Sequence, residues 1–377
     1  MEIVCRREDW VFGVRTVSYA LGGRTAMPIL GGIRCQAEGE GVELAATDLE
    51  RSILCRIPAQ VKGVGAVVLP GQVLSQLVSR LPSAETIELG EQDGRARLAC
   101  GPASFDLLTL PADEFPDVAR WDGEAVGRVP LTALLQGISQ TAFAALRASE
   151  TTRLALTGVD IVLRDGAAKL AATNGYRLAI KRVSIEGLPE AYEGSFLVDA
   201  AVLGDLSRVL AGVTEEEVAV YAAGGQLHFA AGPVFFSCRT IQEQFPDFER
   251  VVPKDSEIGL FAPRGELLDT LRRLEVFAAE ESGAVNLKVV GSALEMTAAS
   301  KDKGQGRESV SLRKPPAKGV EIAFRAEYLI DALRRMESDQ VALWLSAPER
   351  AGLLEPAGEI ASSDEGFIYV CMPVRLL

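Results

Sequence analysis

The sequence contains a single histidine, His228, in 377 residues, and other signs of enzymatic chemistry are also absent. With one histidine, serine or cysteine triads and histidine-rich metal centres are nearly excluded. The flanking Leu227 and Phe229 suggest that His228 has a structural role in a strand. No G-x-x-x-x-G-K-[ST] phosphate loop occurs, and the segment 304–306 lacks the third glycine of a dinucleotide fingerprint. We therefore predict that the protein is not an enzyme and uses no catalytic metal and no cofactor.

Long apolar segments and paired cysteines are absent too. No run of 18 or more apolar residues occurs, and residues 1–6 lack the apolar core of a signal peptide. No CxxC pattern joins the six scattered cysteines, which are Cys5, Cys35, Cys55, Cys100, Cys238 and Cys371. We expect reduced, mostly buried thiols in a cytoplasmic protein, because disulfides are rare in proteins without an export signal.

Positive charge is scarce. The net charge is −13, and no third of the chain is basic. Taken alone, this argues against nucleic acid as a partner, because affinity for nucleic acid rests on neutralising phosphates. Acidic runs such as residues 215–217 are interpreted as solvated loops, with weak binding of a divalent ion left open. The location of the arginines therefore decides the question.

The chain repeats itself at a spacing of about 126 residues. The matching segments are Leu44-Ala-Ala-Thr-Asp48, Leu170-Ala-Ala-Thr-Asn174 and Met296-Thr-Ala-Ala-Ser300. Repeats of this length are whole domains rather than solenoid units. We predict three similar lobes, at residues 1–125, 126–255 and 256–377.

Each lobe contains two stretches with helical periodicity among short alternating segments that are typical of strands. The apolar stripes of the six expected helices begin at Trp10, Leu74, Leu134, Leu203, Leu267 and Leu329. Turns such as Gly101-Pro102 suit an antiparallel meander, and the connections are too short for helical crossovers. We therefore expect an α+β fold in which each lobe packs two helices on an antiparallel sheet.

Arginine recurs at one place on these helices. Five or six positions after the start of each stripe, on the side away from the core, five of the six helices carry arginine. The exception is the first helix of the second lobe, with Ser139 and Gln140. The helical segments contain as many arginines as carboxylates, so the excess negative charge lies elsewhere. A solvated face shaped by the helix dipole would explain the pattern as well, but recurrence in three related lobes favours a common arginine-bearing surface.

Several motifs, in order along the whole chain, resemble those of the bacterial β sliding clamp family, the processivity subunit of DNA polymerase III. They include Pro28-Ile-Leu-Gly31, Ala46-Thr-Asp-Leu-Glu50, Leu110-Pro-Ala-Asp-Glu-Phe-Pro-Asp117, Ala172-Thr-Asn-Gly-Tyr-Arg-Leu178, Gln244-Phe-Pro-Asp247 and Tyr369-Val-Cys-Met-Pro-Val-Arg-Leu376. The resemblance implies a crescent of three lobes that dimerises head-to-tail into a closed ring, with helices lining the hole. Its partners would be double-stranded DNA, polymerase subunits, an ATP-driven clamp loader and other replication or repair proteins, with no membrane.

Helix dimensions agree with two chains in the ring. Six helices about 10 Å wide would enclose a hole of only about 9 Å, too small for a duplex whose two grooves alone are roughly 16 Å deep. Twelve helices would leave about 28 Å. We therefore predict that these arginines face DNA inside a dimeric ring: Arg15, Arg24, Arg80, Arg208, Arg272, Arg273, Arg334 and Arg335.

The resemblance also implies a groove between the second and third lobes that receives a short hydrophobic peptide from partner proteins. Carried over position by position, its residues are Arg153, Leu156, Thr173, Gly175, Tyr176, Arg177, Leu178, Pro246, Val251, Tyr328, Val370, Met372, Pro373, Val374, Arg375 and Leu376. The chain departs from the family pattern at Ala155, Tyr176, Arg325 and the extra Leu377, so preference among peptide motifs stays open. At the ring joint, Phe105 and Leu107 of one chain should meet Phe277 and Ala278 of the other.

Two other functions compete with a topological DNA tether. One is a protein-interaction hub whose groove matters and whose hole does not. The other is a carboxylate-based enzyme at a lobe interface. Retention on circular DNA, with release when the DNA is cut, separates the tether from both.

Overall fold

The computed structural model describes residues 1–23, 27–92, 94–118, 120–121, 123–279, 282–316 and 318–374. Residue contacts divide the chain into two compact units. The first comprises residues 1–131, 186–189 and 202–240, and the second comprises residues 132–185, 190–201 and 241–377. Strand pairing is antiparallel in every sheet of the described chain, as the short connections predicted.

The first unit contains two sheets. The five-stranded sheet has the order β5 (Gln60–Gly63), β1 (Glu2–Arg6), β7 (Thr86–Gln92), β8 (Arg95–Cys100), β9 (Ala103–Leu108). The eight-stranded sheet has the order β10 (Gly127–Pro130), β15 (Glu217–Ala223), β16 (Gln226–Ala231), β17 (Val234–Arg239), β4 (Arg51–Pro58), β3 (Gly41–Thr47), β2 (Gly32–Glu38), β6 (Gly65–Pro70).

The second unit repeats this plan. Its eight-stranded sheet has the order β14 (Gly194–Asp199), β11 (Gly158–Arg164), β12 (Ala167–Thr173), β13 (Arg177–Ser184), β25 (Phe367–Cys371), β24 (Gly352–Ala357), β23 (Gln340–Leu345), β18 (Ile258–Pro263). Its four-stranded sheet has the order β21 (Gly304–Ser311), β20 (Ala293–Ser300), β19 (Ala284–Val290), β22 (Glu321–Arg325).

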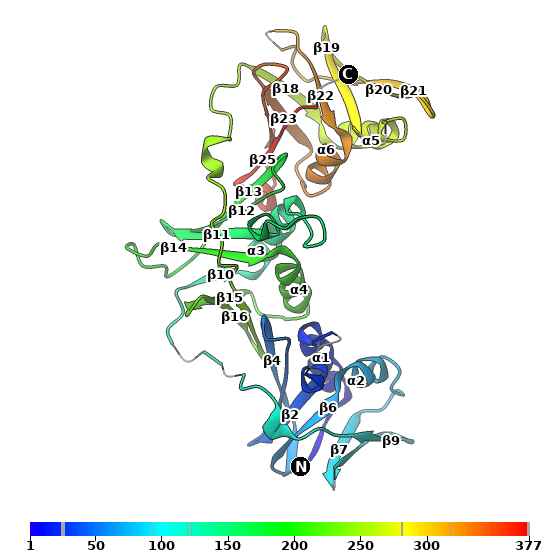
Figure 1. The fold of residues 1–377 in the computed structure, drawn as a ribbon, viewed down its shortest axis with the longest axis vertical. Coiled ribbons are helices and arrows are strands. Elements are labelled where there is room, and N and C mark those ends of the chain that lie inside the picture. Colours follow the sequence, from blue (N-terminus) through cyan, green and yellow to red (C-terminus); the bar gives the residue numbers. More distant parts are fainter. Residues whose placement is uncertain are drawn as a thin grey trace. The chain divides into compact units, whose positions relative to one another are not determined.

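The helices form where the apolar stripes predicted them. The longer helices of the described chain are α1 (Arg7–Val17), α2 (Gly71–Val78), α3 (Leu131–Thr141), α4 (Ala200–Leu210), α5 (Arg264–Glu275) and α6 (Ala326–Leu333). The stripe residues of α1, Trp10, Val14 and Val17, are fully buried, because one apolar face of each helix packs on a sheet. Helices α1 and α2 contact one another, as do α5 and α6 (Figure 1).

Short 3₁₀ segments connect these elements. They are η1 (Ser18–Ala20), η2 (Pro28–Gly31), η3 (Ala112–Glu114), η4 (Ala142–Ala144), η5 (Leu154–Leu156), η6 (Phe248–Arg250) and η7 (Ser362–Asp364). The repeated motif of the sequence ends β3, β12 and β20. The repeat therefore marks equivalent hairpins in the three lobes.

The sequence did not predict that the two large sheets each join strands from two lobes. Strand β17 of the second lobe pairs with β4 of the first, with Cys238 opposite Arg51. Strand β25 of the third lobe pairs with β13 of the second in the same way, with Cys371 opposite Arg177. Each joint between lobes within the chain is thus a continuous sheet.

Both joints also bury an apolar cluster. One contains Leu54, Phe115 and Phe235. The other contains Leu178, Phe248 and Val370. Burial of such clusters against a shared sheet is the main favourable term that holds neighbouring lobes together.

Candidate functional site

The predicted DNA-facing arginines lie on or just after helices, as the stripe pattern required. In the described chain, Arg15, Arg208 and Arg272 belong to α1, α4 and α5, whereas Arg80 and Arg334 follow the ends of α2 and α6. All five are exposed. Arg24 lies outside the described residues.

Two of these arginines, from different lobes, line one hollow in the first unit. The hollow has a volume of about 430 Å³, and α1 and α4 contribute to its wall. Arg15 and Arg208 line it, together with the aromatic side chains of Phe12 and Tyr19. Arginine and aromatic groups are the residue types that contact phosphates and bases. The structure thus brings together two residues that the sequence separates by more than a lobe.

Three polar residues of the predicted helix faces contact protein groups from other segments of the chain. Arg273 makes a bidentate ion pair with Glu308 of β21, at 2.8 and 2.6 Å. Arg335 is half-buried, with its guanidinium 4.1 Å from the ring centre of Phe143, and burial lowers the pKa of Arg335. Gln140, expected to point outward, is fully buried.

The reason for the last difference is a neighbouring element. The Nε2 of Gln140 donates to a carboxylate oxygen of Asp364 at 2.8 Å and to the backbone oxygen of Arg335 at 3.0 Å. Asp364 is itself buried and also accepts from the backbone and the hydroxyl of Ser338. In α3, the residue six positions after the first stripe residue, Gln140, therefore faces protein, whereas the residue five positions after it, Ser139, is exposed.

Predicted peptide-binding residues gather around one turn of the second unit, between β12 and β13. Thr173 Oγ1 donates to the backbone oxygen of Arg177 at 2.6 Å and accepts from the backbone N–H of Gly175 at 3.0 Å. Gly175 has φ +89°, a conformation that favours glycine. Asn174 accepts from the N–H groups of Tyr176 and Arg177. The turn leaves the Tyr176 side chain 66% exposed.

The side chain of Arg177 anchors this turn to the third lobe. Its Nη1 pairs with Asp331 of α6 at 2.7 Å, and its Nη2 donates to the backbone oxygen of Phe143 at 2.7 Å. Its guanidinium lies over the ring of Tyr328 at 4.7 Å. Burial acts to lower the pKa of Arg177, but Tyr369, Asp331 and Tyr328 reverse the direction and raise it. Arg177 is therefore a largely buried cation that connects the turn to α6.

Exposed apolar side chains lie around the turn. Tyr176 is joined to Met372 through the N–H of Met372, which donates to the backbone oxygen of Tyr176 at 2.8 Å. Met372 is 42% exposed. Val251 is 54% exposed and follows η6, whose Phe248 packs in one cluster with Leu178 and Val370. Apolar residues that stay this accessible in one region indicate a docking surface. A flexible methionine allows it to accommodate varied ligands.

The other predicted peptide-site residues divide by burial. Leu156, Thr173, Leu178 and Val370 are buried, and Leu178 lies opposite Val370 across the β13–β25 pairing. Half-buried are Pro246, Tyr328, Pro373 and Val374, whereas Arg153 is exposed. Arg375 and Leu376 lie outside the described residues, as does Leu377.

The departures from the family pattern have distinct surroundings. Ala155 is buried, and its N–H donates to Glu243 at 2.8 Å. The guanidinium of Arg325 lies 5.6 Å from the ring centre of Tyr328. Tyr176 and Arg325 thus place a large exposed ring and a cation near the edge of the predicted peptide site.

The predicted ring-joint residues lie on one open sheet edge, which carries Phe105 and Leu107, and just after α5, where Phe277 and Ala278 stand beside a second edge. Strand β9 ends the five-stranded sheet and β21 ends the four-stranded sheet. On β9, Leu107 is buried, Phe105 is half-buried and the neighbouring Leu108 is 69% exposed. Phe277 packs on Gly306 of β21 so closely that a Cβ there would lie 2.8 Å from the ring, and Ala278 is buried. An exposed apolar edge strand invites pairing with another chain.

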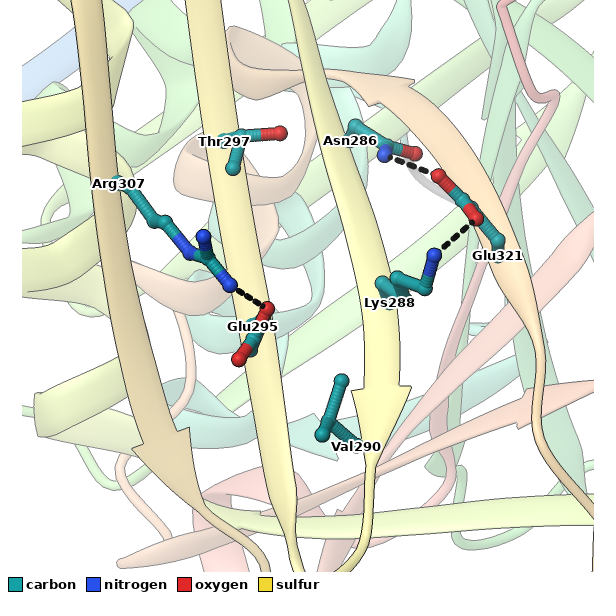
Figure 2. A pocket seen from close by; sticks show the side chains of 7 residues that line it. All are labelled: Asn286, Lys288, Val290, Glu295, Thr297, Arg307 and Glu321. Atoms are coloured by element: carbon teal, nitrogen blue, oxygen red, sulfur yellow. Dashed lines mark hydrogen bonds and ion pairs between the residues drawn. The ribbon is translucent and has the colours of Figure 1, made fainter.

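Nothing in the described chain resembles a catalytic centre. A hollow of about 420 Å³ lies on the four-stranded sheet, and Figure 2 shows its charged lining residues paired with one another. Arg307 pairs with Glu295, and Lys288 pairs with Glu321 at 3.0 Å. No group of three or more potential metal ligands occurs among the described residues. Mutually neutralised surface ions leave no poised acid, base or nucleophile.

The thiols and the lone histidine fit this reading. The six cysteines are free and buried, as predicted, and burial raises the pKa of Cys5, Cys55, Cys238 and Cys371 to about 12. Protonated thiols are poor nucleophiles.

His228 lies in β16, as its neighbours predicted. It is buried in a ring stack with Trp121 and Phe235, and its Nδ1 is hydrogen-bonded to Ser237. Burial lowers the pKa of His228. It is therefore a packing residue.

Two arginines have acidic partners that the sequence pattern did not predict. Arg51 pairs with Asp205, and Arg177 pairs with Asp331. Each pair spans 154 residues. A signal for these pairs was present in the sequence. Arginine ends the same turn in the first and second lobes, and aspartate is the sixth residue of both α4 and α6, the second helices of the second and third lobes.

No helix within the described ranges is long and apolar enough to cross a membrane.

Three consecutive family profiles match this chain. They describe the N-terminal, central and C-terminal domains of the DNA polymerase III beta subunit, over residues 1–119, 128–247 and 249–375. The beta sliding clamp of Synechococcus elongatus is 28% identical over 381 residues, covering all of both chains. Among solved structures, the Bacillus subtilis DNA polymerase sliding clamp matches over the full length of both chains with a TM-score of 0.91 and 26% identity. The Thermotoga maritima DNA polymerase III beta subunit does so with 0.90 and 25%.

Proposed function

Because this chain belongs to the bacterial β sliding clamp family of DNA polymerase III, we propose specific residues for each part of a clamp's work. The protein is a DNA sliding clamp without enzymatic activity, and it dimerises and binds DNA, polymerase and other partners. We place it in the cytoplasm. The lobe boundaries near residues 125 and 255 are part of the proposal.

The observation that carries the proposal is the convergence of Arg15 and Arg208 on one hollow. Two lobes there present cations on one helix-bounded surface, in a chain whose net charge is −13. Arg80, Arg272 and Arg334 occupy corresponding exposed places. Exposed arginines attract phosphates through screened, sequence-independent forces, and these permit sliding. Arg208 and Arg272 each pair with an aspartate of their own helix, Asp205 and Asp269, and stay exposed. Arg273 and Arg335 contribute less to DNA binding, because Glu308 and the ring of Phe143, from other segments, hold their side chains.

The proposed peptide site is the surface around the β12–β13 turn and the end of β25. Tyr176, Val251 and Met372 offer exposed apolar contacts, and the adjoining strands β13 and β25 contribute the buried Leu178 and Val370. Anchoring of Arg177 to Asp331 holds the turn in place before a peptide arrives. A preformed apolar surface lowers the entropy cost of binding a short peptide.

The internal repeat predicts how two chains join. The N–H of Arg239 donates to the oxygen of Glu50, and the N–H of Met372 donates to the oxygen of Tyr176, both at 2.8 Å. These bonds lie one residue beyond the pairs Cys238–Arg51 and Cys371–Arg177. In the first lobe, Leu107 occupies the position that corresponds to Cys238 in the second lobe and to Cys371 in the third.

A second repeated bond fixes that equivalence. In each lobe, the residue three positions after Cys238, Cys371 or Leu107 donates its N–H to a backbone oxygen. The bonds are Ile241 to Leu197, Val374 to Ala323 and Leu110 to Val68. Those acceptors each precede the second helix of their lobe by three residues. Strand β9 should therefore pair with the partner's β21, because β21 is the third-lobe counterpart of β4 and β13. Leu107 then faces the partner's Gly304, and Phe105 faces the partner's Gly306.

Replacing Phe105 with Asp should convert the dimer to monomer at micromolar concentration. In the proposed pairing Phe105 is buried beside the partner's Phe277, and an unpaired carboxylate in an apolar joint is strongly unfavourable. Analytical ultracentrifugation would show the loss as at least a hundredfold rise in the dimer dissociation constant. The matched control is Val64→Asp, at an apolar side chain that is 74% exposed. Equal association of F105D and the unaltered protein would remove Phe105 from the joint.

Small-angle X-ray scattering of the unaltered protein tests the ring as a whole. The dimer should give the distance distribution of an annulus with an open centre. A distribution typical of a compact particle would reject the proposed function.

A further inference from the structure

We propose that the joint between subunits lacks an ion pair that latches both joints within the chain, and that this missing pair speeds the separation of the subunits. We call the subunit joint the seam. The inference rests on the proposed dimer, and it goes further by naming the charged contact whose absence weakens that joint.

The latch is the same in both within-chain joints. Arg51 is the first residue of β4 and pairs with Asp205, the sixth residue of α4. Arg177 is the first residue of β13 and pairs with Asp331, the sixth residue of α6.

Each latch connects one lobe's hairpin with the following lobe's second helix. The four side chains are between 9% and 23% exposed, so solvent screens these pairs less than pairs on the open surface.

The hairpins that carry the latch arginines are built alike. In the first lobe, Thr47 Oγ1 donates to the oxygen of Arg51 at 2.9 Å, and Asp48 accepts from the N–H of Arg51 at 2.8 Å. Thr173 and Asn174 make the same bonds to Arg177. Only the turn at Arg177 carries an exposed tyrosine of the peptide site. Because Arg51 repeats the arrangement elsewhere, the arrangement itself belongs to the joint rather than to the peptide.

The seam has neither member of the pair. The first residue of β21 is Gly304, and the sixth residue of α2 is Gln76. The hairpin between β20 and β21 is also longer by one residue. In the first lobe, four residues separate the paired Thr47 and Ser52. At the equivalent position of the third lobe, five residues separate the paired Ala299 and Gln305. A glycine opposite an amide cannot form a charged pair.

Other charges of the two edge strands do not replace the latch. On β9, Asp106 pairs with Arg97 of the adjacent strand at 2.9 Å. On β21, Glu308 pairs with Arg273, and Arg307 pairs with Glu295. Each of these charges is thus satisfied within its own lobe. The seam is left with main-chain pairing and the apolar contacts of Phe105, Leu107 and Phe277.

A double-mutant cycle tests the missing latch. One change replaces residues 300–304 with the sequence of residues 174–177, which shortens the hairpin and ends it in arginine; the other is Gln76→Asp. Subunit exchange is followed by fluorescence energy transfer between differently labelled dimers of the full chain. We expect the combined variant to exchange at least tenfold more slowly than the product of the two single effects predicts, because close charge pairs at interfaces are coupled.

An exchange rate equal to that product would overturn the inference while leaving the ring intact. If the unaltered protein formed no dimer, the proposed function and the inference would both fail. Hydrogen exchange on the unaltered dimer covers the case of a hairpin variant that does not fold. The N–H groups of β9 should then exchange at least tenfold faster than the equivalent groups of β17 and β25. Equal protection in all three strands would contradict a weaker seam.

Discussion

Met372→Asp should reduce affinity for clamp-binding peptides by at least about a hundredfold, equivalent to roughly 2.7 kcal/mol. Met372 is 42% exposed next to Tyr176, so a bound apolar peptide would bury its side chain. A carboxylate there would lose its water without gaining a partner. Fluorescence anisotropy with a labelled peptide from a polymerase subunit measures the change directly.

The control for this prediction is Val290→Asp. Val290 is similarly exposed, at 46%, but lies in β19 beside the charged hollow of Figure 2. V290D should bind the peptide as the unaltered protein does, and both variants should stay dimeric. Removal of Met372–Leu377 should abolish polymerase binding in the same way. Full affinity in M372D or in the truncated chain would place the peptide site elsewhere.

Replacing five exposed arginines with alanine should shorten retention on circular DNA at least tenfold at physiological salt, while the dimer stays intact. The five are Arg15, Arg80, Arg208, Arg272 and Arg334. Each phosphate contact that is lost should also lower the slope of log affinity against log salt by about 1. Loss of retention and loading is followed by gel filtration of clamp–DNA complexes at several salt concentrations.

A control variant with the same change in net charge distinguishes the effect of where the arginines lie from the effect of overall charge. Its five replaced arginines are exposed and lie outside α1–α6: Arg95, Arg128, Arg182, Arg250 and Arg313. This control should retain DNA nearly as well as the unaltered clamp. Equal losses in both variants would mean that overall charge, rather than a pore surface, governs DNA binding.

Local patterns predicted the helices and the buried thiols well. Trp10, Val14 and Val17 follow the helical repeat and are buried on a sheet, because periodicity depends on neighbouring residues alone. The 126-residue repeat likewise predicted three similar lobes. The joining of lobes into continuous sheets could not be predicted from local patterns, because the β17–β4 and β25–β13 pairings depend on contacts between segments far apart in the sequence.

The errors at individual side chains have the same origin. A helical wheel places Gln140 away from its own sheet, but it cannot show that Asp364 lies there to accept a hydrogen bond. The ring of Phe143 covers Arg335 for a similar reason. Conversely, the turn at Arg177 resembled the family's peptide site strongly enough to be assigned from sequence. Its bond to Asp331 became evident only in three dimensions.

The most direct test of the central claim is release from DNA by cutting. Clamps loaded on nicked circular DNA are separated from free protein, the DNA is linearised with a restriction enzyme, and the bound fraction is measured again. We expect stable retention on circles and loss within minutes on linear DNA, because a ring is held by topology and slides off free ends. Equal retention on both forms would contradict an encircling clamp.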